Sequence, residues 1–147
     1  MKKITQWMLL FAFVGLVLSF YAFFHNRGFV SVTLCDLNAK INCDIVNKGP
    51  YSVIAGIPVS LLGIIGYFFL IVATWLKRKN PEDKSLTRFL LFSSLGALLF
   101  TLYLSALEAF VIQAWCLICV TSQLMMLFFT YCSFRIFIFE RKQKLLV

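Results

Sequence analysis

Four long apolar stretches constrain this chain more than any other feature of its sequence. A helix needs about 20 predominantly apolar residues to cross the hydrocarbon core of a bilayer. Because 61% of the residues are hydrophobic and only 14% are charged, a soluble domain of this size would expose too much apolar surface. We therefore predict an all-α membrane protein, a four-helix bundle in one domain over residues 1–147 with an extracytoplasmic cap at about residues 26–52. The predicted transmembrane helices cover residues 4–24, 53–76, 89–114 and 116–139.

The basic residues flank these stretches unequally, and this asymmetry predicts the orientation. Three lie on the side of the loop at residues 26–52: Arg27, Lys40 and Lys48. Eleven lie on the other side: Lys2, Lys3, Lys77, Arg78, Lys79, Lys84, Arg88, Arg135, Arg141, Lys142 and Lys144. Since basic residues favour the cytoplasmic side, both termini are expected there, in a multi-pass protein of the cell inner (cytoplasmic) membrane. The net charge of +8 thus reflects topology, and no nucleic-acid partner is predicted.

Four cysteines fall on the predicted outer side, which is the oxidising one. Cys35 and Cys43 lie in the loop, whereas Cys116 and Cys119 form a C-x-x-C motif at the start of the last helix. Residues i and i+3 share one helix face, within disulfide reach. The helix N-terminus favours a thiolate at Cys116, so its sulfur should exchange more easily. Cys119, one turn deeper, is better placed to meet an oxidant dissolved in the lipid.

Two other uses of these cysteines were weighed against a redox role. An all-cysteine zinc site would join the two pairs, but the C-x7-C spacing of Cys35 and Cys43 is not a usual zinc spacing, so we predict no metal. Structural disulfides would explain the outer location equally well. Closing a loop as short as Cys116 to Cys119 removes little chain entropy, which favours thiol–disulfide exchange. Electrons would then pass inward to a lipid-soluble two-electron acceptor, such as a quinone.

The motifs around these cysteines resemble the vitamin K epoxide reductase family in its bacterial form. The matching segments are Ile41-Asn42-Cys43-Asp44, Pro50-Tyr51-Ser52, Gly56-Ile57-Pro58-Val59-Ser60-Leu61-Leu62-Gly63 and Trp115-Cys116-Leu117-Ile118-Cys119, preceded by Cys35. The resemblance implies a four-helix bundle around a quinone. It also implies that Cys119 faces the quinone, Cys116 accepts electrons from Cys43, and Cys35 meets an outside partner. That partner would be a thioredoxin-like periplasmic or extracytoplasmic oxidase acting in trans, and the electrons would enter the membrane quinone pool.

The quinone site is expected near the C-x-x-C motif. Its candidate residues are Ser60, Phe110, Gln123 and Cys119. The mammalian enzymes of the family carry a tyrosine four residues beyond the second active-site cysteine, where this chain has Gln123. The resemblance therefore implies ubiquinone or menaquinone as the acceptor rather than vitamin K epoxide. Glu108 is a further candidate, because a carboxyl inside an apolar stretch suggests a polar interior or proton pathway.

The predicted function is a membrane thiol-disulfide oxidoreductase that takes electrons from its partner, passes them to a quinone and so drives disulfide bond formation. Two alternatives stay open at this point. One is a membrane conduit that carries reducing equivalents outward, which would need cysteines on the cytoplasmic side. The other is a non-enzymatic membrane protein with structural disulfides.

Overall fold

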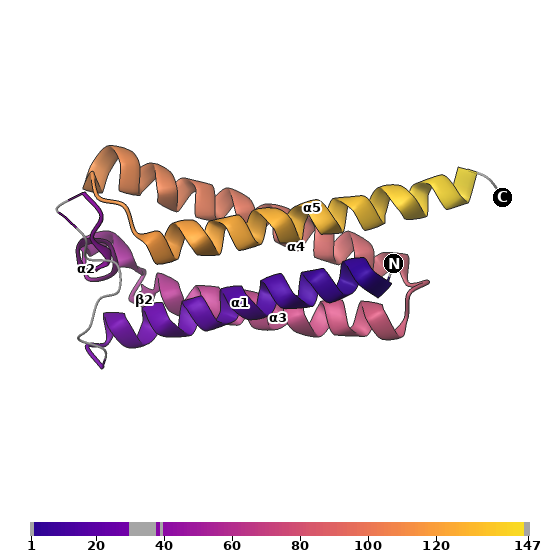
Figure 1. Ribbon diagram of the computed structural model, residues 1–147, viewed down its shortest axis with the longest axis horizontal. Helices are drawn as coiled ribbons and strands as arrows, with labels where there is room; N and C mark the ends of the chain where they lie inside the picture. Colours follow the sequence, from indigo (N-terminus) through magenta and orange to yellow (C-terminus); the bar gives the residue numbers. More distant parts are fainter. Residues whose placement is uncertain (1, 30–37, 39, 146–147) are drawn as a thin grey trace.

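Four long helices dominate the computed structural model, which describes residues 2–29, 38 and 40–145 (Figure 1). Their bounds are α1 Lys2–Asn26, α3 Val59–Lys79, α4 Lys84–Leu107 and α5 Leu117–Leu145. Four segments built on these helices, with α4 extended to Ile112, are long and apolar enough to cross a membrane. The predicted all-α bundle of four transmembrane helices is confirmed.

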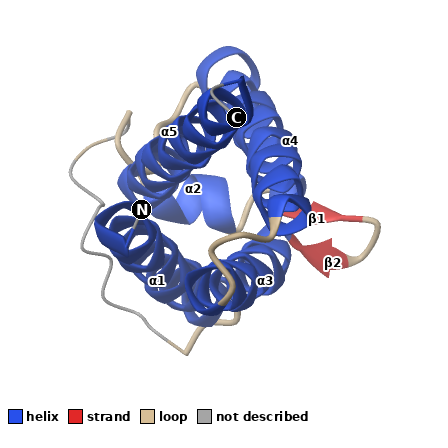
Figure 2. Cartoon of the chain, turned by 90° about the vertical axis from the view of Figure 1, so that its right-hand side faces the viewer, coloured by secondary structure: helices blue, strands red, loops and turns tan. Residues whose placement is uncertain are grey.

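The four helices form a closed ring when the bundle is viewed along its length (Figure 2). Helix α1 packs against α3 and α5, and α4 completes the ring by packing against the same two helices. Both termini lie at one end of the bundle, and the short elements lie at the other (Figure 1). The long helices thus enclose a central space that the short elements cover at one end.

The short elements at this end are α2 (Cys43–Asn47), a 3₁₀ turn η1 (Pro50–Ser52) and the antiparallel strands β1 (Val53–Ile54) and β2 (Ile57–Pro58). Ala55 and Gly56 join the strands with positive φ angles of 52° and 81°, as a two-residue hairpin turn requires. This hairpin moves the start of α3 to Val59, beyond the residue 53 predicted from hydropathy. Apolar composition alone could not distinguish the hairpin from a helical turn.

The third membrane helix also ends differently from the prediction. Helix α4 gives way at Glu108 to a π-helical turn, η2 (Glu108–Ile112). Gln113 then adopts a left-handed conformation with φ of 55°, and such a residue terminates a helix. The helix therefore stops short of residue 114, and the chain crosses to α5 through an extended segment.

The bundle core is narrow and contains residues from all four long helices. Its buried members are Met8, Ala12, Tyr67, Leu70, Ala73, Leu90, Met126, Phe129 and Ile136. Helices α1 and α3 approach closely at Gly15, because a Cβ there would lie 2.2 Å from Cζ of Tyr67. The Tyr67 hydroxyl donates to the Ser122 carbonyl at 2.9 Å, so this ring links α3 to α5.

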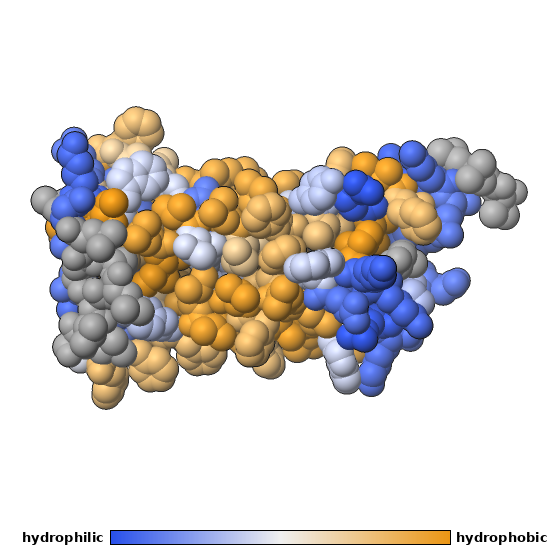
Figure 3. All heavy atoms as spheres, viewed as in Figure 1, coloured by the Kyte–Doolittle hydropathy of each residue, from blue (hydrophilic) through white to orange (hydrophobic). Residues whose placement is uncertain are grey.

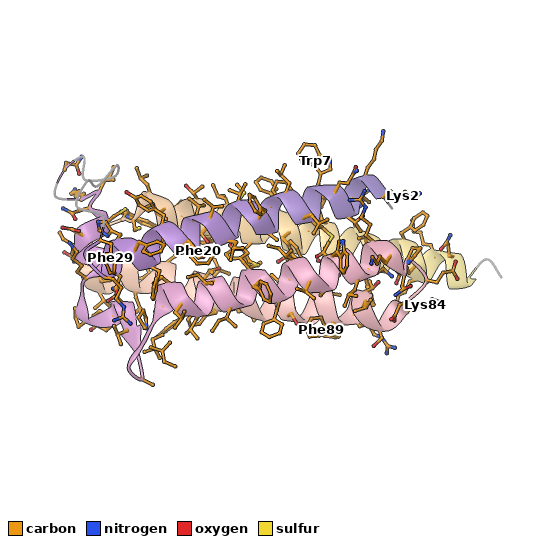
Figure 4. The ribbon with its side chains drawn as sticks, turned by 90° about the horizontal axis from the view of Figure 1, so that it is seen from below. Lys2, Trp7, Phe20, Phe29, Lys84 and Phe89 are labelled. Atoms are coloured by element: carbon orange, nitrogen blue, oxygen red, sulfur yellow. The ribbon has the colours of Figure 1, made fainter. Side chains whose placement is uncertain are left out.

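Many large apolar side chains also cover the outside of the bundle. Trp7 and Phe89 project outward (Figure 4) and are 56% and 49% exposed. On the face seen in Figure 3, apolar residues form a band between two polar ends. Such a band exposed to water would be unfavourable, whereas lipid tails solvate it. The surface supports the membrane assignment that the hydropathy predicts.

A buried ion pair joins three helices at the end where the termini lie. Lys77 Nζ is 2.6 Å from Glu140 Oε1, and the hydroxyl of Thr87 donates to the same oxygen at 2.9 Å. Lys77 also donates to the carbonyls of Pro81 and Asp83, both at 2.8 Å. Its ammonium is therefore fully hydrogen-bonded, which a buried charge requires. This network fixes the end of the bundle opposite the cysteines.

Candidate functional site

A short stretch of the outer loop is tied to the start of α5. The backbone N–H of Asn42 donates to the Trp115 carbonyl at 3.1 Å, and the Trp115 N–H donates to the Lys40 carbonyl at 2.8 Å. Asn42 also caps α2, since its side chain accepts from the N–H of Ile45 at 3.1 Å. These bonds place Cys43, the first residue of α2, beside Cys116, the residue before α5.

The resulting sulfur contact is the central feature of the site. The Sγ atoms of Cys43 and Cys116 lie 3.1 Å apart, and the two residues are 1% and 0% exposed. Cys43 is disulfide-bonded, whereas Cys116, Cys119 and Cys132 are free thiols. Cys35 lies outside the described residues, so its expected pairing with Cys43 stays a prediction. A thiol in direct contact with a disulfide sulfur is the arrangement that thiol–disulfide exchange needs.

Several donors surround the Cys116 sulfur. The backbone N–H of Cys119 approaches it at 3.4 Å, and the Asn47 side-chain amide donates to it at 3.7 Å. The hydrogen bond from the Cys119 thiol lowers the pKa of Cys116 below the ordinary range of a thiol, although burial and the nearby Glu108 charge oppose this shift. A lowered pKa increases the thiolate fraction, and the thiolate is the nucleophile in exchange. The structure supports Cys116 as the exchanging sulfur.

Glu108 closes the other side of the cysteine pair. It is the first residue of η2 and only 3% exposed, and its Oε2 accepts from the backbone N–H of Cys116 at 3.1 Å. Glu108 thus lies in a polar part of the interior, as its place in an apolar stretch suggested, because the η2 turn directs it toward the pair. Such a contact depends on backbone conformation and could not be seen in the sequence.

A cavity of about 190 Å³ opens inside the bundle next to the pair. Its wall is mostly apolar, and its polar members come from α1, α2, η1, α3, α4, η2 and α5: Ser19, Asn26, Asn47, Tyr51, Ser52, Ser60, Tyr67, Thr101, Ser105, Glu108, Cys119 and Ser122. An apolar pocket with a few polar groups is the usual form of a small-molecule site. The pocket therefore suits a mainly apolar molecule bearing a few hydrogen-bonding atoms.

Of the four residues predicted for the quinone site, two line the cavity and two do not. Ser60 and Cys119 line the cavity. Gln123 lies one step behind the wall, where its side-chain oxygen accepts from the hydroxyl of the lining residue Ser105. Phe110 is 82% exposed and is not part of the wall, because η2 rotates it away from the bundle interior. Proximity in sequence to the cysteines was a poor guide to this residue.

Asn26 and Asn47, which the sequence did not single out, connect α1, α2 and Cys116 at the cysteine end of the bundle. Asn26, at the end of α1, donates to the Asn47 carbonyl, and Asn47 in turn contacts Cys116. His25 is also buried, at 1% exposed, and its Nε2 lies 3.0 Å from Oδ1 of Asp44. The loop elements bury these side chains, and no helical or strand periodicity in the sequence could indicate that.

The site does not match a metal centre in the part of the chain that the structure describes. No group of three or more potential metal ligands occurs among those residues. Cys43, which the zinc alternative requires, is in a disulfide, and thiolates rather than disulfide sulfurs bind metal. This observation weighs against an all-cysteine zinc site.

Four candidate membrane-spanning helices around a buried contact between a thiol and a disulfide sulfur define the class of this protein: a polytopic membrane protein with cysteines paired at one end of its bundle. In sequence comparison, residues 6–134 match the vitamin K epoxide reductase family. Because this match covers most of the chain, the protein belongs to that family, and it is a membrane oxidoreductase of the thiol–disulfide type. A comparison with curated proteins gives no match.

Proposed function

We propose that this protein oxidises the thiols of an extracytoplasmic partner and passes the electrons to a membrane quinone. Electrons would enter at Cys35 and Cys43, cross to Cys116 and Cys119, and leave to ubiquinone or menaquinone. The product for the cell is a disulfide in the partner, which can then be donated to secreted proteins. In this scheme the four cysteines are catalytic.

The 3.1 Å contact between the sulfurs of Cys43 and Cys116 carries this proposal. Reduced Cys43 would attack the disulfide of Cys116 and Cys119 and form a mixed disulfide with Cys116. Cys35 would then resolve that bond, leaving an oxidised loop pair and a reduced C-x-x-C pair. The oxidation states present match this product, since Cys43 is in a disulfide while Cys116 and Cys119 are free.

On the donor side, the sulfurs of Cys116 and Cys43 are not accessible to a partner protein, because both residues are almost completely buried. A large dithiol protein cannot reach either sulfur directly. Cys35 is the remaining cysteine in the outer loop, so a thioredoxin-like oxidase acting in trans would exchange with it first. Transfer through an accessible sulfur to a buried one would also keep the C-x-x-C pair away from unrelated thiols.

The acceptor side fits a quinone ring. A cavity of about 150 Å³ lined by apolar groups can bind benzene, so the 190 Å³ space beside Cys119 is sufficient for a quinone head group. Ser60 reaches this space, and its hydroxyl is suited to donate a hydrogen bond to a quinone carbonyl. The bound ring would supply a two-electron, two-proton acceptor, while the residues of the chain orient it and exclude water.

The proposed location is a bacterial inner membrane with the termini in the cytoplasm. The basic residues support this orientation, because most of them lie near the termini or in the connection between α3 and α4, at the end of the bundle that carries the termini. The cysteine end then faces the oxidising compartment, where disulfide chemistry is permitted.

Purified protein in detergent tests the function directly. Given a reduced thioredoxin-like protein and a short-chain ubiquinone, the wild type should bleach the quinone absorbance and oxidise the partner in equal amounts. Cys119→Ser should abolish quinone reduction, whereas Cys132→Ser is the matched control and should keep the wild-type rate. Quinone reduction that persists without Cys119 would refute the scheme.

The same preparation separates the two alternatives. An outward reductant conduit predicts that hydroquinone or a cytoplasmic dithiol reduces the partner, so the net reaction would run in the opposite direction. A structural role for the cysteines predicts that Cys116→Ala and Cys119→Ala lower the unfolding temperature but leave the thiol state of secreted proteins unchanged.

A further inference from the structure

Glu108 is a buried acid that the relay described above does not use. Its carboxyl is 3% exposed, and one oxygen is held at 3.1 Å by the N–H of Cys116. The same residue lines the cavity together with Cys119 and interacts electrostatically with the sulfurs of both cysteines. Glu108 thus touches the reacting thiols and the space where the acceptor would bind.

The cost of placing an acid here suggests a chemical role. Among the described residues, none of the ion pairs involves Glu108, so no cation offsets its charge. A carboxylate in a low-dielectric site is expensive under these conditions. A glutamine would accept the same N–H hydrogen bond without that cost. What the carboxyl offers in addition is the ability to bind and release a proton.

The proposed reaction needs such a group. Two thiols give up two electrons and two protons when they form a disulfide, and a quinone takes up both electrons and both protons to become a hydroquinone. Cys119 must lose its thiol proton inside the bundle, where bulk water is excluded. Transfer of that proton to Glu108 moves one negative charge from oxygen to sulfur and creates no new charge, so it avoids the desolvation penalty of an additional ion.

We propose that Glu108 is the proton acceptor for the Cys119 thiol and the proton donor to the reduced quinone. This inference rests on the proposed quinone-reducing function and deepens it. In the balanced step, the Cys119 proton passes to the Glu108 carboxylate and then to one quinone oxygen. The bond between the two sulfurs forms, and the two electrons released reduce the ring. The second quinone oxygen takes up a proton from water, equivalent to the proton that Cys116 loses when it becomes a thiolate. The carboxylate is regenerated.

The titratable groups around Glu108 define what a pH profile reports. They are Cys116 before α5, Cys119 on α5, Tyr51 of η1 and Tyr67 of α3; α1 and α4 contribute no acid or base to the cavity wall. Glu108 is the carboxyl among the described lining residues. Protonation of Glu108 and protonation of the Cys116 thiolate both lower the rate toward acid pH, so the part due to Glu108 is the difference between the wild-type and Glu108→Gln profiles.

Single-turnover quinone reduction tests the proposal. The full chain in detergent, prereduced with dithiothreitol, is mixed anaerobically with a short-chain ubiquinone. Glu108→Gln keeps an acceptor for the Cys116 N–H but cannot take a proton, so the rate should fall about 100-fold, a typical loss for a missing acid–base group. The rate should also rise with pH, because solvent hydroxide must then deprotonate Cys119. Glu82→Gln, the same change at an exposed site, should behave as wild type.

Each outcome either supports or overturns the role of Glu108 in proton transfer. A Glu108→Gln rate within twofold of wild type with the same pH profile overturns the inference. If this variant does not fold, Glu108→Asp replaces it: its shorter carboxyl should slow the step at least tenfold, and an unchanged rate again overturns the inference. The Cys119→Ser variant distinguishes failure of the proposed function from failure of the proposed role of Glu108. Quinone reduction that survives in Cys119→Ser refutes the proposed function itself, whereas loss there with an unaffected Glu108→Gln refutes the role of Glu108 alone.

Discussion

At the scale of single residues, the two cysteines of the C-x-x-C motif have different surroundings. Cys116 is anchored at its N–H by Glu108 and receives hydrogen bonds at its sulfur from Cys119 and Asn47. Cys119 faces the cavity. The chain therefore prepares one sulfur for exchange with Cys43 and exposes the other to the enclosed space. This division follows from where the helix begins, one residue after Cys116.

The lowered pKa of Cys116 gives a prediction with a definite sign. A thiol whose pKa is lowered keeps its reactive thiolate down to a lower pH, and the hydrogen bond from the Cys119 thiol is the main cause. In Cys119→Ala this donor is absent, so the midpoint of the Cys116 titration should move to higher pH. The measurement is the thiolate ultraviolet absorbance of the reduced protein against pH.

The control for this titration is Cys116→Ser, whose difference from wild type isolates the Cys116 signal. Cys132→Ser should leave that signal in place, since Cys132 lies far along α5. A midpoint that does not move in Cys119→Ala would contradict the assignment of Cys119 as the donor.

At the scale of elements, the contact between α1 and α3 aligns the cavity wall. Gly15 of α1 lies against the ring of Tyr67, and the Tyr67 hydroxyl bonds to α5. Tyr67 also lines the cavity. A change in the spacing of α1 and α3 is therefore transmitted to the site through one side chain.

Gly15→Ala should destabilise the protein, because the added Cβ would lie 2.2 Å from the Tyr67 ring. Overpacking of this kind costs about 1 to 3 kcal/mol. The expected result is a lower unfolding temperature in detergent, measured by tryptophan fluorescence. The matched control is Gly96→Ala on α4, where an added Cβ meets nothing within 4 Å; this variant should be neutral or slightly stabilised by its helix propensity. Equal effects of the two substitutions would contradict the close approach.

At the scale of the whole molecule, the two ends of the bundle differ in the residues they carry. One end carries the termini and most basic residues and is held by the Lys77–Glu140 ion pair. The other carries the cysteines and the short elements that bury them (Figure 1). Between them lies an apolar surface suited to lipid (Figure 3). This polarity of the molecule is what an electron path between an aqueous partner and a lipid-soluble acceptor requires.

Opposite labelling of the two ends tests this arrangement. In a variant whose native cysteines are replaced by serine, Phe29→Cys and Glu82→Cys each introduce one exposed thiol, at opposite ends of the bundle. A membrane-impermeant maleimide should label Phe29→Cys in intact spheroplasts and Glu82→Cys only after permeabilisation. Labelling of both from one side would contradict a membrane-spanning bundle, and the reverse pattern would contradict the proposed orientation.

The sequence by itself determined the four helices, the membrane class and the importance of Cys116 and Cys119. These depend on hydropathy, charge placement and local spacing, which any helical segment in lipid must obey. It did not determine where α3 begins or where α4 ends, because hairpin and π-turn geometry depend on backbone angles at Ala55, Gly56 and Gln113.

Only the tertiary structure decided which residues meet at the site. Cys43 reaches Cys116 across 73 positions of sequence separation because segment 40–42 pairs with Trp115. Glu108 and Phe110 lie on opposite faces of the same turn, and the packing of η2 against the bundle decides that Glu108 is the one that faces the cavity. Such contacts arise when separate elements pack around a shared cavity, and no single segment contains the information that specifies them.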